Sequence, residues 1–412
     1  MAALVVLVGC CAILATSALT YTDPVAASAA SSTAETNVTF VSTQGRLGTL
    51  GEGRIVAFDT DRRTAVWTHT AYDRYFDVDP MGNDRLLFAA VEAEPGVGAG
   101  TTYAVVVNWR TGERVERFRV APDVHDVDYL GDGEYLVADK FHHTVYVRNL
   151  TLGDIVWRYN FTKQFPASAG NGPPTTGTEY THLNDVDPVD NGSAFLVSPR
   201  NFDRVVLINR SAERVEWTLG AQDDHSVLRE QHNPTLVETD PPTVLVADSE
   251  NDRVVEYTRT NGTWERTWLF DRGLNWPRDA DRLPNGNTLV ADTRNQRALE
   301  VDPNGSVVWE VRIPEMPYDA ERLRHGDEPG GPTARSLGAM GTVDATESQS
   351  AVDWLGRRVV EVHAVARWVL PPWVSVADFV VLVVGASTLF GWVGAEAALR
   401  ARPVVGRLRR VE

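Results

Sequence analysis

RDADRLPNGNTLVADTRNQRALEV, residues 278–301, contains the pattern on which the fold of this 412-residue chain depends. Two acidic residues, Asp279 and Asp281, flank one small apolar residue, and a Pro-Asn-Gly turn separates them from the runs LVAD and RALEV. Short apolar runs between turn residues predict antiparallel strands joined by hairpins. A further polar turn and a run that contains Trp309 follow, so the stretch predicts a four-stranded unit.

The acidic pair recurs along the chain. It is found again at Asp77-Val78-Asp79, Asp126-Val127-Asp128, Asp185-Val186-Asp187 and Asp319-Ala320-Glu321. The first residues of successive pairs are 49, 59, 94 and 40 positions apart, and the longest interval holds a degenerate copy at His232-Asn233-Pro234. Four-stranded repeats of roughly 40 to 50 residues are typical of β-propeller blades.

We therefore expect an all-β fold, a six-bladed β-propeller over residues 37–330. Five blades lie wholly in sequence and begin near residues 77, 126, 185, 233 and 279. The sixth has its inner strand near Tyr318–Leu323 and takes its outer strands from the N-terminal side, at Val38–Ser42, Arg54–Asp59 and Thr64–Thr68. Closure by both ends of the repeat removes the open edge that an array of strands would expose.

Composition restricts the environment and the partners. The formal net charge is −17, and only Lys140 and Lys163 among the 39 basic residues are lysine. Such a surface indicates a halophilic protein, because high salt screens its self-repulsion, and it argues against nucleic acid as a partner. Both cysteines, Cys10 and Cys11, precede the propeller, so we expect no disulfide or thiolate metal site in it, and no cofactor.

Two apolar segments flank the propeller. Residues 1–20 are expected to be an N-terminal transmembrane segment or signal anchor; a cleaved signal peptide and a misassigned start codon remain open. Residues 369–396, with a charge-free run at 379–395, predict a C-terminal transmembrane helix. Five arginines lie in the tail at 397–412, so the positive-inside rule predicts a cytoplasmic C-terminus and an extracellular propeller at the cell membrane. A linker at 331–350 and an amphipathic helix at 351–368 are expected between propeller and membrane.

Seven Asn-x-Ser/Thr sequons agree with an extracellular glycoprotein. They begin at Asn37, Asn149, Asn160, Asn191, Asn209, Asn261 and Asn304. The alternative is that several of them are simply favourable turn sequences. The sequence does not decide between the two.

The first strand of each propeller blade lines the central channel, so the residues just before the acidic pairs are expected at its mouth. These residues are Tyr75 and Phe76, His125, His182, His232, Arg278 and Tyr318. Three of the nine histidines thus take equivalent positions in three successive blades, and an arginine takes the fourth. Asn184 and Arg200 belong to the same blade as His182 and are expected to join them. In an acidic protein, such a ring predicts a site for an oxyanion such as sulfate or phosphate.

The segments that carry this ring resemble the arylsulfotransferase (aryl-sulfate sulfotransferase) family. They are THLNDVDPVDNGSAFLVSPRNFDRVVLI (181–208), WTLG (217–220), EQHNP (230–234) and RDADRLPNGNTLVAD (278–292). The resemblance covers most of the six blades and is densest between residues 181 and 310.

The resemblance implies transfer of a sulfuryl group from an aryl sulfate to a phenol through a sulfohistidine, independently of the nucleotide donor PAPS. His182 and His232 match the histidine-bearing motifs of the family. Arg278 stands where a third family histidine is expected, and His125 is expected to serve instead. The catalytic residues are then His125, His182 and His232, and the substrate-binding residues are Arg278, Asn184, Arg200 and Tyr318.

Other interpretations of the same residues remain open. The three histidines could satisfy buried carbonyls or neighbouring Asp residues. They could also hold zinc or copper, as in an NHL-like propeller, or line the channel of a non-catalytic interaction module. The paired Asp residues are expected to be structural and to accept backbone N–H groups. His142 and His143 are expected on the surface, and His225 in a loop that could reach the pocket.

Overall fold

The computed structural model describes residues 2–23, 25, 37–45, 52–94, 97–343, 351–366, 370–371 and 373–408. The chain divides into two compact units. One unit is Pro24–Glu347, and the other combines Met1–Asp23 with Ser348–Glu412.

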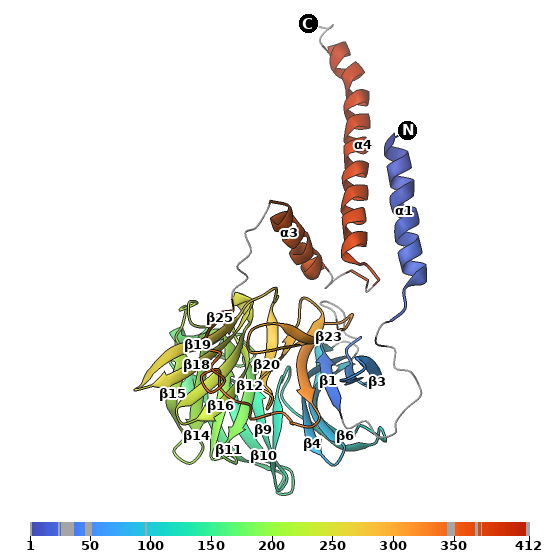
Figure 1. Ribbon diagram of the computed structural model, residues 1–412. Coiled ribbons are helices and arrows are strands. Elements are labelled where there is room, and N and C mark those ends of the chain that lie inside the picture. The colour runs from blue at the N-terminus through green and yellow to red at the C-terminus, as the bar shows by residue number, and fades with distance from the viewer. Residues whose placement is uncertain are drawn as a thin grey trace. The chain divides into compact units, whose positions relative to one another are not determined.

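Six antiparallel sheets of four strands, one of them extended by a fifth strand, form the first unit (Figure 1). Blade 1 contains β4 (Arg74–Gly82), β5 (Arg85–Glu94), β6 (Val97–Asn108) and β7 (Arg114–Arg119), and blade 2 contains β8 (Val127–Gly131), β9 (Glu134–Asp139), β10 (Thr144–Asn149) and β11 (Asp154–Asn160). Blade 3 contains β12 (Leu183–Val189), β13 (Ala194–Pro199), β14 (Arg204–Asn209) and β15 (Arg214–Gly220), and blade 4 contains β16 (His232–Thr239), β17 (Pro242–Asp248), β18 (Arg253–Thr260) and β19 (Thr263–Phe270). Blade 5 contains β20 (Pro277–Arg282), β21 (Thr288–Asp292), β22 (Arg297–Val301) and β23 (Val307–Arg312).

Blade 6 is built from both sides of the repeat. Its inner strand β24 (Pro317–Arg322) pairs with β1 (Val38–Thr43), and β2 (Ile55–Asp59) and β3 (Thr64–His69) complete the sheet. Val41 lies opposite Ala320 in this antiparallel pair. The expected six-bladed propeller and its closure are confirmed.

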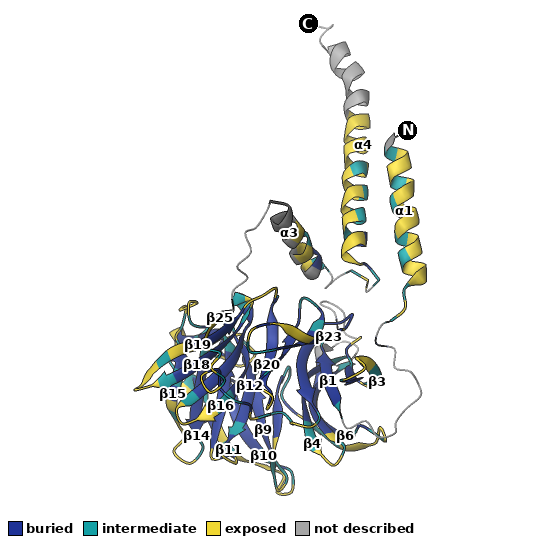
Figure 2. Ribbon diagram, viewed as in Figure 1, coloured by how far each residue is buried: buried dark blue, intermediate teal, exposed yellow. Residues whose placement is uncertain are grey.

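Each inner strand separates two environments. The middle residues of the acidic pairs, such as Val78, Val186 and Ala280, are fully buried between sheets. Because side chains alternate along a strand, the flanking acidic residues are directed the other way, toward the central channel. Figure 2 shows the resulting pattern, with buried inner strands and exposed loops and outer edges.

The paired Asp residues join neighbouring blades, as expected of structural residues. Asp319 Oδ2 accepts the backbone N–H of Val78 at 2.8 Å, and Asp279 Oδ2 accepts that of Ala320 at 3.2 Å. Asp126 Oδ2 accepts the backbone N–H of Val186. These bonds satisfy inner-strand donors that face the next blade rather than a strand of their own sheet.

The expected linker at 331–350 is wrong for its first part. Ala334 is fully buried, and its N–H reaches both carboxylate oxygens of Glu256 at 3.0 Å. The short strand β25 (Gly341–Val343) then pairs in parallel with β19. Residues 331–343 therefore belong to the propeller, and residues 344–350 lie outside the described part of the chain.

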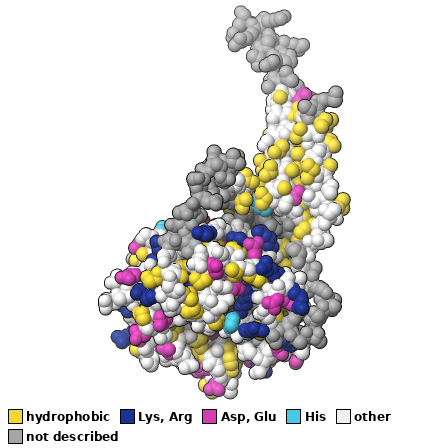
Figure 3. All heavy atoms as spheres, viewed as in Figure 1, with side chains coloured by type: hydrophobic (Ala, Val, Ile, Leu, Met, Phe, Trp, Pro, Cys, Tyr) yellow, Lys and Arg dark blue, Asp and Glu magenta, His cyan; other side chains and the backbone are white. Residues whose placement is uncertain are grey.

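The second unit contains three helices, α1 (Ala2–Thr20), α3 (Ala351–Ala366) and α4 (Val376–Leu408). The segments Ala3–Thr20 and Val376–Ala397 are long and apolar enough to cross a membrane. Hydrophobic side chains are abundant on the visible face of the described part of these two helices, among backbone atoms and side chains of other types (Figure 3).

The second of these helices begins later than expected, at Val376 rather than 369, and continues to Leu408 through most of the expected tail. Ser375 and Asp378 explain its start. The Asp378 carboxylate accepts both the N–H and the hydroxyl of Ser375, which is the capping-box arrangement of a helix N-terminus. Asp378 also accepts the Ser17 hydroxyl of α1 at 2.7 Å, so this lone charge in the apolar segment has two structural roles.

Candidate functional site

A β-bulge near the start of the inner strands brings additional side chains to the channel mouth. In blade 3 the pairing of β12 with β13 shifts between Leu183 and Asp185, and in blade 5 that of β20 with β21 shifts between Pro277 and Asp279. Asn184 and Arg278 are the additional residues. Because a bulge re-aims one side chain relative to the regular alternation, each can approach the channel beside the acidic residue that follows.

His182 is not in register with His125 and His232, which corrects part of the sequence-based expectation. Asp185 and Asp279, the first acidic residues of their pairs, lie opposite Ser198 and Ala291, and in blade 4 His232 lies opposite the equivalent Ala247. In blade 4 the bulge lies one residue later, at Asn233, because Pro234 pairs with Val246 as Ala280 pairs with Val290. His182 lies two residues before Asn184, ahead of β12, whereas His125 and His232, counted back from the middle of their inner strands, have the position equivalent to Arg278.

The three imidazoles nevertheless lie close together, around the ring of Tyr318. The ring centroids of His125 and His182 are 5.7 Å apart, and the Tyr318 ring lies 5.6 Å from His125 and 6.3 Å from His232. Phe76 stacks on His125 at 4.3 Å. His125, His232, Phe76 and Tyr318 are at most 5% exposed, so the imidazoles share a nearly dry environment.

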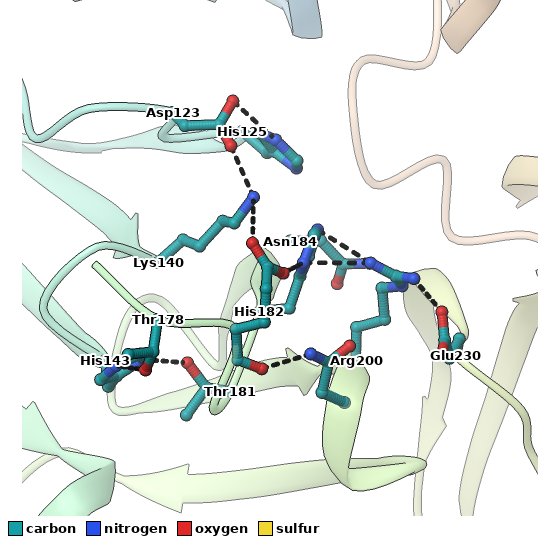
Figure 4. A network of polar contacts seen from close by, with 12 residues as sticks. Asp123, His125, Lys140, His143, Thr178, Thr181, His182, Asn184, Arg200 and Glu230 are labelled. Carbon is teal, nitrogen blue, oxygen red and sulfur yellow. Dashed lines mark hydrogen bonds and ion pairs between the residues drawn. The ribbon is translucent and has the colours of Figure 1, made fainter. Parts of the chain in front are cut away.

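His125 contacts an acidic and a phenolic group. Its Nε2 lies 3.4 Å from Asp123, and its Nδ1 lies 3.3 Å from the Tyr318 hydroxyl. Lys140 approaches the other oxygen of Asp123 at 2.5 Å, so a cation lies close to the site (Figure 4). The Lys140 side chain is 11% exposed, which keeps its charge poorly screened.

His182 has polar partners on both ring nitrogens. Its Nδ1 contacts the Glu179 carboxylate, and Arg200 Nη1 approaches Nε2 at 3.1 Å (Figure 4). Arg200 is held in turn by an ion pair with Glu230. The polar network therefore connects blade 3 to the segment that leads into blade 4.

His232 has a defined tautomer. Its Nδ1 lies 2.8 Å from the Ser249 hydroxyl, and that hydroxyl lies 2.6 Å from the Pro277 carbonyl oxygen. A carbonyl only accepts, so Ser249 gives its single proton to Pro277 and accepts from the Nδ1–H of His232. The lone pair of the neutral imidazole is then on Nε2.

Arg278 lies between two aromatic rings. Its guanidinium carbon is 4.1 Å from the Trp276 centroid and 5.0 Å from that of Tyr318, and Nη1 donates to the side-chain oxygen of Gln44. Arg278 is 7% exposed, and it forms no ion pair with a carboxylate of the described residues. This cation is therefore available to balance the charge of a bound anion.

The histidines are held neutral near pH 7. Burial lowers the pKa of His125 to about 4, and the charges of Lys140 and Arg278 add to the effect. Burial, with Lys140 and Arg200, holds the pKa of His182 well below its usual 6.5. Burial, with Arg278 and Arg200, does the same to the pKa of His232. The site combines neutral imidazoles with permanent cations.

The geometry does not favour a metal held by these histidines. Among the described residues, four groups of three His, Cys, Asp or Glu side chains bring their ligand atoms within 4.8 Å of one another. None of the four contains His125, His182 or His232. Each of the three imidazoles instead has its own polar partner.

The remaining histidines lie elsewhere. The surface prediction is wrong for His143, which is 1% exposed and contacts the Thr181 hydroxyl and the Thr175 carbonyl oxygen at 2.9 and 2.8 Å. The His142 side chain is half exposed beside Asp139. His225 lies 3.5 Å from Asp203, and among the described residues it contacts none of the three site histidines.

Sequence reasoning missed several residues of the site. Ser249 and Trp276 precede or follow strands of blades 4 and 5, and Lys140 and Glu179 lie in loops of blades 2 and 3. Only Lys140 offered a signal, as one of two lysines in the chain. The others are common residue types whose importance depends on the packing of neighbouring blades.

Comparisons with known proteins support the fold. No protein-family model and no curated protein matches the sequence. Among solved structures, a protein of unknown function from Bacteroides caccae is 16% identical, with a TM-score of 0.51 over 70% of this chain and 99% of the other. A candidate 6-phosphogluconolactonase from Bacteroides uniformis is 14% identical, with a TM-score of 0.48 over 70% and 100% of the two chains. At 16% identity the likeness to the Bacteroides caccae protein concerns the fold alone.

Proposed function

We propose that the channel mouth transfers a sulfuryl group from an aryl sulfate to a phenol without a nucleotide donor, and that His232 becomes a transient sulfohistidine. The observation that carries the proposal is the tautomer of His232. Ser249 holds the proton on Nδ1, so Nε2 keeps a lone pair in a pocket where burial prevents protonation. Such a nitrogen is a competent nucleophile at neutral pH.

In the first half-reaction Nε2 attacks sulfur, the N–S bond forms, and the S–O bond to the aryl group breaks. The phenolate leaves with the electron pair, and the Nδ1 proton stays on the ring. Arg200, Arg278 and Lys140 stabilise the sulfuryl oxygens and the departing phenolate. Covalent catalysis thereby divides one difficult displacement into two easier ones.

In the second half-reaction the oxygen of the acceptor phenol attacks sulfur, and the S–N electrons return to Nε2. Neutral His182 accepts the phenol proton and later releases it to solvent. The neighbouring Glu179 carboxylate stabilises the imidazolium that forms. Asn184 and Tyr318 complete the substrate-binding residues of this proposal.

A turnover assay tests the proposal. Full-length protein in detergent and molar KCl is mixed with a chromogenic aryl sulfate and a phenol, and release of the coloured phenol is followed. We expect acceptor-dependent release that falls at least about a thousandfold in His232→Ala. His142→Ala, a histidine outside the site, is the control and keeps the wild-type rate.

Absence of release by the wild-type protein would remove the enzymatic interpretation and leave a binding module. Release that persists in His232→Ala would assign the nucleophile elsewhere.

We further propose that the protein is anchored in the cell membrane with its propeller outside. The proposal rests on the two candidate spans and the arginines after the second one. Of the sequon asparagines, Asn191, Asn261 and Asn304 are exposed, which suits N-glycans. Asn149 is 9% exposed, and its side chain accepts the Leu152 N–H, so a turn role explains that sequon better.

A further inference from the structure

The channel is lined by acidic side chains beyond the histidines. The acidic pairs of five inner strands contribute these carboxylates, each at most 9% exposed: Asp77, Asp79, Asp126, Asp128, Asp185, Asp187, Asp279, Asp281, Asp319 and Glu321. The sulfuryl-transfer proposal gives them no role. Bringing so many carboxylates together in a protein interior costs free energy unless protons or cations neutralise them.

Several of these oxygens have no hydrogen-bond partner among the described residues. Asp77 Oδ2, Asp79 Oδ1 and Asp128 Oδ2 are fully shielded atoms of this kind. Their side chains are at least nine-tenths buried, so water does not replace the missing partner easily. Carboxylate oxygens that lack a hydrogen-bond partner and share one channel are suitable ligand atoms for a cation.

The oxygens converge on Asp327. One ligand oxygen from each of Asp77, Asp79 and Asp327 lies within 4.8 Å of the other two, and Asp128, Asp187 and Asp327 form a second such group. Asp327 belongs to the segment that follows β24, after the last strand of the propeller repeat. A cavity of about 460 Å³, lined by Asp79, Asp128, Asp327 and Glu328, adjoins both groups and offers a way in.

We propose that Asp77, Asp79, Asp128, Asp187 and Asp327 bind calcium in the acidic part of the channel, beside this cavity. Purely oxygen ligands select a hard cation. Several carboxylates that come from separate strands suit the six to eight ligands and flexible geometry of Ca²⁺ better than the strict octahedron of Mg²⁺. Calcium bound at these two groups, which share Asp327, connects blades 1, 2 and 3 to the chain segment that follows blade 6.

This proposal is independent of sulfuryl transfer, because none of the five residues belongs to the histidine site. The role of the bound calcium is to stabilise the closed ring of blades. A cation at Asp327 cross-links residues that are about 250 positions apart in sequence, such as Asp77 and Asp327.

Full-length protein in detergent provides the test. The protein is treated with EDTA, exchanged into molar KCl and titrated with CaCl₂ alone, and binding is measured by calorimetry and by the shift of the thermal midpoint. Wild type is expected to bind Ca²⁺ saturably and to melt at higher temperature with it, because the ion binds only the folded ring. Asp327→Asn and Asp79→Asn should each lower the affinity at least about tenfold.

The two variants also distinguish a metal site from an ordinary structural carboxylate. In EDTA, Asp327→Asn should melt at or above the wild-type temperature, because it removes one of several mutually repelling charges. Asp248→Asn is the matched control; this buried carboxylate is paired with Arg253 at 2.6 Å, so its loss lowers the midpoint and leaves Ca²⁺ affinity unchanged.

Failure of wild type to bind Ca²⁺ overturns the proposal. So does a wild-type Ca²⁺ response in both Asp327→Asn and Asp79→Asn. If both variants fail to fold in EDTA, the carboxylates are structural and the proposal is also wrong.

Discussion

His232 differs from the other two site histidines in what its nitrogens contact. His125 and His182 each have polar groups at both ring nitrogens, whereas His232 has Ser249 at Nδ1 and no hydrogen-bond partner at Nε2 among the described residues. Ser249 is therefore a positioning residue that acts through the imidazole. In the proposed reaction, this serine, one residue beyond β17, makes His232 the better nucleophile of the three.

Ser249→Ala should lower kcat about tenfold and leave KM nearly unchanged, because the second partner of a reactive imidazole fixes its tautomer and orientation. Steady-state kinetics with the chromogenic aryl sulfate measure this. Ser226→Ala, which removes an exposed hydroxyl that contacts Asp224, is the control. A parallel rise in KM, or no loss of kcat, would show that the contact with Ser249 does not orient the nucleophile.

The pH profile follows from the same environment. An unfolded histidine takes up a proton near pH 6.5, while the pKa of folded His232 is held well below that value, so acidification below pH 6.5 both favours unfolding and eventually removes the nucleophile. We expect kcat/KM to be constant above pH 6.5 and to fall only at clearly lower pH.

Replacement of a neighbouring cation should move that acid limb. Arg278 lowers the pKa of His232, so Arg278→Gln should shift the limb to higher pH, and it should also raise KM because an anion-binding group is lost. Arg266→Gln, on the exposed part of β19, is the control. An acid limb that stays in place in Arg278→Gln would contradict the electrostatic account.

At the residue scale, the sequence predicted which histidines and arginines converge but not how they are arranged. The spacing of the acidic pairs located His125, His232 and Arg278 at the channel mouth. Their register could not be predicted, because bulges at Asn184 and Arg278 depend on pairing with the second strand of each blade. The contact between the Ser249 hydroxyl and His232 could not be predicted either, since it forms only when β16 and β17 pair.

At the element scale, the segment 331–343 is fixed by one buried carboxylate. Glu256 of β18 and Arg282 of β20 are both fully buried and 3.1 Å apart. Glu256 also accepts the Thr267 hydroxyl at 2.7 Å and the Ala334 N–H. This carboxylate thus connects blades 4 and 5 and the C-terminal extension.

Glu256→Ala should lower the free energy of unfolding by about 3 to 5 kcal/mol, because it leaves the Arg282 charge buried without its partner. Urea denaturation of the full-length protein measures this. Glu265→Ala, on an exposed part of β19, should change stability by less than about 0.5 kcal/mol. Equal effects of the two substitutions would refute a special role for Glu256.

The sequence predicted the blades better than the connections. Alternating apolar runs and turn residues define strands locally, and an incomplete sixth blade required closure by the N-terminal strands. The sequence after the repeat suggested a linker over residues 331–350 instead. Its true position depends on Glu256 and β19, which lie far away in the sequence.

At the scale of the whole molecule, the two ends of one channel have opposite chemistry. Imidazoles, arginines and a lysine surround the start of the inner strands, and carboxylates line the rest. The acidic groups around Asp327 could not be predicted from the repeat. Asp327 and Glu328 follow its last strand, so their position depends on the path of the chain after β24. The acidic pairs were correctly expected to be structural. The sequence could not show that several of their oxygens have no hydrogen-bond partner among the described residues.

The membrane topology is tested on intact cells. Protease added from outside should degrade the propeller and leave an epitope tag after Glu412 protected, because the arginines that follow the second candidate span, Val376–Ala397, favour the cytoplasmic side. Lysed cells, in which both are accessible, are the control. A tag that is digested in intact cells while the propeller survives would reverse the orientation.

The central claim is that His232 carries the sulfuryl group. The most direct measurement is mass spectrometry of the protein after brief incubation with an aryl sulfate and no phenol, followed by peptide mapping under alkaline conditions. We predict a mass gain of one sulfuryl group on the peptide that contains His232, lost when a phenol is added and absent in His232→Ala. An unmodified His232 together with a sulfurylated His125 or His182, or no adduct in a protein that releases phenol, would contradict the account.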